Sequence, residues 1–152
     1  MTASTAKLPV GSKFFIGDGG SPTETFTAVI NVKSIGVSGG QADEIDVTHL
    51  DSSAGFREYI AGFKDAGEIE LGLMFDPSST THAIASRSLY ELFKSGTTFN
   101  WRIDIPWGSA VYRFSGSSFI KSEPKINLAP DSPAEGTVTI RRTGPTTLAL
   151  VP

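Results

Sequence analysis

The sequence has no cysteine and only two histidines among its 152 residues. The lack of cysteine excludes disulfide bonds and thiolate metal sites, and it leaves the redox compartment open. The side chains that most often bind transition metals or serve as general bases are therefore scarce. The composition predicts a protein that is not an enzyme and that needs no cofactor.

A strong charge imbalance and a long apolar run are also missing. The net charge is −3, from 13 basic and 16 acidic residues, whereas a groove for nucleic acid needs a basic excess. No apolar run approaches the ~18 residues that a membrane-spanning helix requires. The N-terminal residues also lack the apolar segment of a signal peptide. We therefore expect no membrane contact, no specific binding of nucleic acid, and synthesis in the cytoplasm.

Glycine and proline, by contrast, are plentiful and fall between short alternating segments. There are 16 glycines and 9 prolines, and hydrophobic residues make up 39% of the chain. A chain of this length and composition can bury the core of one domain. Alternating segments separated by such residues indicate many strands joined by tight turns. We predict a mainly β (α+β) fold, an antiparallel β-sandwich or barrel flanked by one α-helix.

The predicted domain spans residues 13–143 and includes one helix over about 79–95. Serine and threonine at 78–81 offer N-cap oxygens, and Gly96 suits the position after the last turn. Apolar residues recur at helical spacing in between, at Ala85, Leu89, Leu92 and Phe93. Residues 1–12 and 144–152 are predicted as extended terminal arms.

The stretch 46–71 departs from the alternating pattern. A strand gives way to a polar turn, and glycines then mark a long loop over about 50–67. Large apolar side chains gather in this loop: Phe56, Tyr59, Ile60 and Phe63. A loop on a monomer surface seldom carries such a cluster unless it docks on something. We predict that these four residues contact another molecule.

The same stretch resembles a known family. The segments DVTHLD (46–51), FREYI (56–60) and GFKDAG (62–67), followed by a strand, resemble the tail tube protein of long, non-contractile-tailed bacteriophages of the lambda type. A matching order of elements extends more loosely from about residue 12 to about residue 144. The resemblance implies a structural virion protein, made in the host cytoplasm and located in the virion tail.

The resemblance also implies what the loop contacts. The resemblance implies hexameric rings that stack into a tube, with Phe56, Tyr59, Ile60 and Phe63 reaching the adjacent ring. Genome DNA would pass through the lumen without specific binding. The partners implied are further copies of the chain, the tape measure protein, the tail terminator and the distal tail proteins.

Outward-facing carboxylates on the predicted strands are candidates for the lumen. A lumen lined by Glu68, Glu70 and Asp104 would repel DNA phosphates and keep the DNA mobile. Arg102 and Arg113 also point outward, so either face of the sheet remains a candidate for lining the channel.

One group of side chains could instead bind a metal ion. Asp46, His49 and Asp51 are close in sequence, and such ligands suit a divalent ion. On a strand, however, Asp46 and His49 point to opposite faces. We predict no metal site and expect the two carboxylates to bond to turn backbone instead.

Two other structural roles fit the strand-rich composition. One is the secretion-tube protein of a contractile injection system, whose expected fold is similar. The other is a capsid decoration or tail-terminator β-barrel protein that works as a monomer or trimer.

Overall fold

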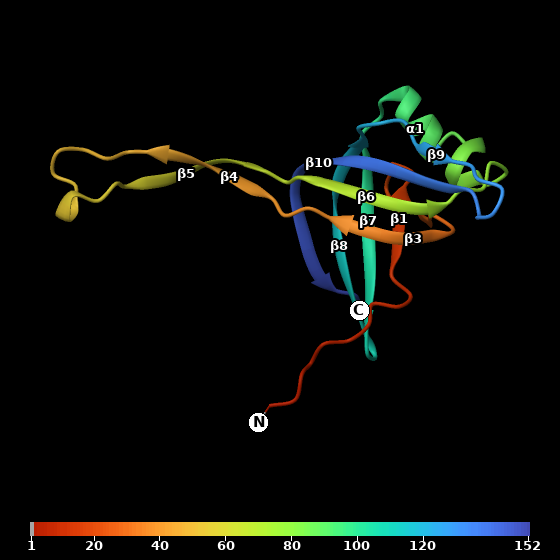
Figure 1. The fold of residues 1–152 in the computed structure, drawn as a ribbon, viewed down its shortest axis with the longest axis horizontal. Coiled ribbons are helices and arrows are strands. Elements are labelled where there is room, and N and C mark those ends of the chain that lie inside the picture. The colour runs from red at the N-terminus through yellow and green to blue at the C-terminus, as the bar shows by residue number, and fades with distance from the viewer. Residues whose placement is uncertain (1) are drawn as a thin grey trace.

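An eight-stranded antiparallel sheet curls into a half-barrel in the computed structural model, which describes residues 2–152 (Figure 1). Its strand order is β2-β1-β7-β8-β10-β6-β3, and β9 pairs with β10. The strands are β1 (Lys13–Gly17), β2 (Phe26–Ala28), β3 (Val32–Val37), β6 (Glu68–Met74), β7 (Phe99–Trp107), β8 (Ala110–Ile120), β9 (Lys125–Asn127) and β10 (Glu135–Leu150). The predicted mainly β fold is confirmed.

The core lies on the inner face of this curled sheet. Period-two alternation in β6 buries Ile69, Leu71 and Leu73 and leaves Glu70 exposed. The antiparallel register sets Ile140 of β10 opposite Ile69, so their apolar side chains meet on the same face. The sequence pattern therefore determines which face of the sheet becomes the interior.

Two short helical segments, rather than one helix, cover one end of the inner face. The segment predicted as a helix over about 79–95 divides into a π-helical turn, Thr80–Ile84, and α1 (Leu89–Ser95). Ala85 is extended, and the Ser88 hydroxyl accepts a hydrogen bond from the Glu91 amide. A new N-cap therefore starts a second helix where the first one ends. Leu89 and Leu92 are buried in the core.

Two further segments differ from their predicted form. The alternating apolar residues of 23–35 predict one strand, but the structure interrupts it at Asn31, whose positive φ of 55° turns the chain and exposes Ile30. The C-terminal segment predicted as an arm is instead the end of β10, because Leu148 and Leu150 pair with Phe114 and Tyr112 after an irregularity between Thr143 and Thr147. Residues 2–11 form no strand and lie largely exposed.

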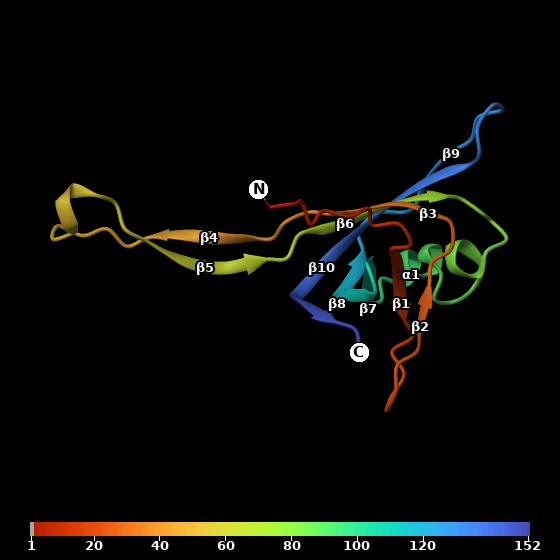
Figure 2. The same ribbon diagram turned by 90° about the horizontal axis from the view of Figure 1, so that it is seen from below.

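A long hairpin projects from the half-barrel (Figures 1 and 2). It is built from β4 (Gln41–Asp46) and β5 (Tyr59–Asp65), which pair only with each other in the described chain. We call residues 38–67 the arm. The loop predicted over about 50–67 is thus shorter than expected, because residues 59–65 are strand. Among residues 2–152, no helix is long and apolar enough to cross a membrane.

Candidate functional site

The arm presents large apolar side chains to solvent. Phe63 is 90% exposed and Phe56 is 74% exposed, while Tyr59 and Ile60 are each more than half exposed. The four residues predicted as a contact cluster therefore lie together on the arm without burial in their own chain. Sequence reasoning missed three further exposed apolar residues there: Ile45, Val47 and Leu50. Ile45 and Val47 alternate with polar residues as in an ordinary strand, so the sequence pattern does not mark them as a contact surface.

Apolar side chains occur on both faces of the arm, with Ile45 and Ile60 on one face and Tyr59 and Phe63 on the other. Ile45 of β4 stands directly opposite Ile60 of β5, so the two side chains share a face. Gly62 lies beside this pair, and a Cβ there would come within 3.0 Å of the Ile45 Cδ1 atom. Tyr59 stands opposite Asp46 on the other face. We call the face with Ile45, Val47 and Ile60 the apolar strip.

Polar side chains at the tip of the arm hold the turn together. Asp46 accepts a hydrogen bond from the Thr48 amide at 2.9 Å and another from Arg57 Nη1 at 2.8 Å. The hydrogen bond from the Thr48 hydroxyl is the main cause that lowers the pKa of Asp46. His49 Nδ1 accepts from the Asp51 amide. No cluster of potential metal ligands occurs among residues 2–152.

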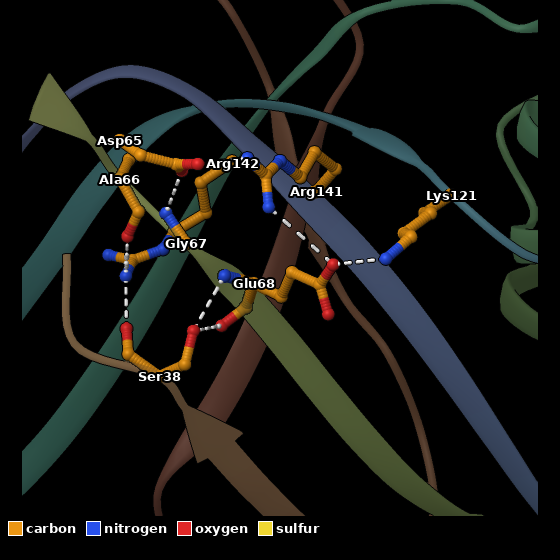
Figure 3. Close-up of polar contacts among 8 residues, drawn as sticks. All are labelled: Ser38, Asp65, Ala66, Gly67, Glu68, Lys121, Arg141 and Arg142. Carbon is orange, nitrogen blue, oxygen red and sulfur yellow. Dashed lines mark hydrogen bonds and ion pairs between the residues drawn. The ribbon is translucent and has the colours of Figure 1, made fainter. Parts of the chain in front are cut away.

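A buried guanidinium joins the arm to the half-barrel (Figure 3). Arg142 of β10 is only 8% exposed, and its Nη2 atom donates to the carbonyl oxygens of Ser38 and Ala66. These two carbonyls belong to the two strands of the arm where they leave the body. The Arg142 amide also donates to the Gly67 carbonyl at 3.0 Å. One residue therefore links both strands of the arm to β10.

Charged pairs surround this link (Figure 3). Arg141 pairs with Asp65 and also lies 3.5 Å from Glu68, which in turn pairs with Lys121. Figure 3 shows these residues together with Ser38, Ala66, Gly67 and Arg142, and we call this set the arm base. The arm base joins β5 to β6, to β10 and to Lys121 directly after β8, so it fixes the direction in which the arm leaves the sheet.

Gly67 has a backbone conformation that the arm base requires. Its φ is +92°, and a Cβ at this position would lie 2.6 Å from the Ser38 hydroxyl oxygen. A side chain here would be strained by the positive φ and would collide with Ser38. The glycine at the end of the GFKDAG motif is thus explained by the close approach of the two arm strands.

The predicted lumen carboxylates do not form one cluster. Glu68 belongs to the arm base, whereas Asp104 of β7 is held by Arg113 through two hydrogen bonds of 2.7 and 2.9 Å. Glu70 is exposed on the outer face, opposite Thr139 of β10. Strands β8 and β10 separate β6 from β7 in the sheet. Two of the three carboxylates are therefore largely neutralised by neighbouring cations.

Residues 8–111 match the family model described as the phage tail tube, lambda-like. The chain belongs to the lambda-like phage tail tube family. This tail tube protein is a structural component of the virion tail. The comparison with curated proteins finds no matching sequence.

Solved structures of assembled tails share the fold of the tail tube protein. The tail of an empty gene transfer agent particle, described with C6 symmetry, is 20% identical, with a TM-score of 0.64 over 90% of this chain and 95% of that one. The SPP1 tail tube is 10% identical, with a TM-score of 0.62 over 90% and 75%. A sheath/tube terminator of an extracellular contractile injection system is 15% identical, with a TM-score of 0.67 over 97% and 99%.

Replacing Arg142 should loosen the arm. In Arg142→Met the Ser38 and Ala66 carbonyls lose their donor, so we expect the free energy of unfolding to fall by about 1–3 kcal/mol. We also expect a broader distance distribution between spin labels at Ala61→Cys and Leu128→Cys, measured by pulsed electron paramagnetic resonance. Arg57→Met, which removes an exposed pair near the tip, is the control. An unchanged distribution in Arg142→Met would contradict the role given to the arm base.

The carboxylates of the arm base should titrate at low pH. The Gly67 amide, and then Arg141, hold the pKa of Asp65 below its ordinary 3.8. The folded chain then binds protons more weakly than the unfolded chain. Asp65 therefore stabilises the fold above pH 3.8, and this contribution is lost as the pH falls through the lower folded value. Carboxyl carbon NMR should give a midpoint below 3.8 for Asp65, and a midpoint at or above 3.8 would refute the pairing.

Proposed function

We propose that this tail tube protein self-assembles into hexameric rings, which stack into the tube that conducts genome DNA into the host. The observation that carries the proposal is the arm, whose large apolar side chains have no packing partner within the described chain. Exposed apolar surface of this extent on a monomer marks a contact site. The C6 symmetry of the gene transfer agent tail supports six copies in a ring.

The arm supplies the contact between successive rings in this proposal. Phe56, Tyr59, Ile60 and Phe63 become buried against a copy in the adjacent ring. Burial contributes ~25 cal/mol per Å² of apolar area, from which the costs of ordering and association are subtracted. The arm is tied to the sheet through the arm base, so less conformational freedom is lost when it docks.

The outer face of the sheet suits a channel that DNA crosses without sticking. It carries two ion pairs, Asp104 with Arg113 and Lys33 with Glu135, while Arg102 lies over the Phe26 ring. Glu70 also lies on this face. We propose that the outer face lines the lumen, because its mixed charges offer DNA phosphates no continuous row of cations. The tape measure, tail terminator and distal tail proteins are the further partners that this assembly implies.

A tail terminator is the second candidate function. The likeness to the sheath/tube terminator extends over nearly the whole of both chains, which favours a terminator as the alternative. A terminator ends a tube with one ring, whereas a tube protein adds ring upon ring. The length of the assembled particle therefore separates the two functions.

Removing the exposed aromatic side chains should abolish tube formation. We expect a triple variant, Phe56→Ser, Tyr59→Ser and Phe63→Ser, to remain a folded monomer, because none of these side chains belongs to the core. Negative-stain electron microscopy of concentrated protein should show tubes for the wild type and none for this variant.

A matched control is available on the body of the protein. Ile84→Ser with Leu128→Ser also removes exposed apolar side chains, and this variant should still form tubes. Tubes of normal length from the triple variant would refute the role of the arm. Single rings from the wild type would favour the terminator.

A further inference from the structure

The inner face of the half-barrel is covered at one end only. The π-helical turn and α1 pack over one end, whereas the other end has an open apolar hollow of about 460 Å³. We call this hollow, together with the residues at its rim, the open face. Its apolar lining comes from four segments of the chain and includes Val10, Val32, Ile35, Val37, Ile105 and Phe114.

Apolar surface continues beyond the hollow. Leu148 stands opposite Phe114 in the register of β8 and β10, so the two side chains share a face. Leu148 is 58% exposed, and Val37, which lines the hollow, is 46% exposed. The open face is therefore a wide apolar surface that the described chain leaves uncovered, and it sits on rigid strands.

The arm of the same copy does not cover the open face. The arm base ties both arm strands to β10, and the arm extends away from the half-barrel in both views (Figures 1 and 2). A second copy, however, brings an arm with a matching apolar strip. Ile45, Val47 and Ile60 form that strip, and Gly62 leaves it flat at one end.

Charge favours the same pairing. The arm carries six carboxylates and two cations, a net charge of −4, whereas the rest of the chain carries ten carboxylates and eleven cations, a net charge of +1. The residues that line the hollow include no carboxylate, so an acidic arm meets no like charge there.

We propose that the open face of one copy binds the apolar strip of the arm of a second copy. The inference rests on the proposed assembly and deepens it, because it names the surface that receives the arm. Ile45, Val47 and Ile60 enter the apolar hollow beside Val37 and Phe114.

Because the chain lacks cysteine, single cysteine variants test the contact directly. Ile60→Cys and Val37→Cys are prepared separately, mixed in equal amounts, concentrated, and treated with a short bismaleimide. We expect a covalent dimer in the mixture and none in either variant alone, because only the mixture places the two thiols together. Ile60→Cys mixed with Leu128→Cys is the control and should give no dimer.

Other outcomes separate this inference from the proposed function. Tubes without a dimer between residues 60 and 37 would overturn the inference and leave the proposed function standing. A dimer between Leu8→Cys and Val37→Cys, in place of that pair, would assign the open face to the second copy's N-terminal segment and also overturn it. A chain that is monomeric at every concentration and gives no dimer would overturn both.

A charge substitution gives a second measurement that does not depend on cross-linking. Val37→Asp brings a carboxylate toward the acidic arm, so the concentration needed for assembly should rise about tenfold or more, equivalent to about 1.4 kcal/mol. Val37→Leu should assemble like the wild type. Both variants should keep the circular dichroism of the wild type, because Val37 lies at the sheet edge. Equal assembly by both variants would count against the open face.

Discussion

The arrangement of the molecule depends on a buried guanidinium at the junction of sheet and arm. Arg142 lies in β10, which is hydrogen-bonded to both β6 and β8, and its side chain bonds the carbonyls that end the two arm strands. Burying a cation is costly unless it is hydrogen-bonded, and here Nη2 donates to the two carbonyls and Nη1 to the Thr146 hydroxyl, although Nε has no partner in the described chain. An isolated two-stranded hairpin is marginally stable. The arm therefore has a defined direction because of the link to the body.

This link explains how one chain combines a packed core with an extended arm. The inner face of the half-barrel collects Phe14, Trp101 and the alternating residues of β6 and β10, which supply the stability. The arm contributes no residue to that core. Its sequence is therefore free to carry exposed aromatic side chains, whose burial the proposed assembly assigns to another copy. The outer face carries charges of both signs, with Asp104 paired to Arg113 and Lys33 to Glu135.

The sequence predicts the faces of the sheet better than it predicts the ends of its elements. Period-two alternation identifies Ile69, Leu71 and Leu73 as core, and the structure buries all three. The prediction of one continuous helix over 79–95 is wrong. The apolar spacing indicates one helix, but the Ser88 hydroxyl caps a second helix that starts after a break. The sequence predicts a loop where β5 forms. Both faces of β5 are exposed and it contains a glycine, so it lacks the apolar–polar alternation of a half-buried strand.

The sequence pattern does not predict contacts between residues that are far apart along the chain. Arg142 reads as one of several cations near the C-terminus, and its partners Ser38 and Ala66 lie 104 and 76 residues away along the chain. The open face likewise joins residues of the N-terminal segment, β3, β7 and β8. The apolar cluster at 56–63, in contrast, can be recognised in the sequence, because large apolar side chains are unusual in a segment predicted to be a surface loop.

Hydrogen exchange along the arm tests most directly whether a second copy covers it. Amides of residues 41–65 are compared by mass spectrometry in dilute monomer and in concentrated, assembled protein. The account predicts slower exchange in peptides of β4 and β5 on assembly, because burial against another copy excludes water from the arm. Exchange in these peptides that is equally fast in both states would contradict it.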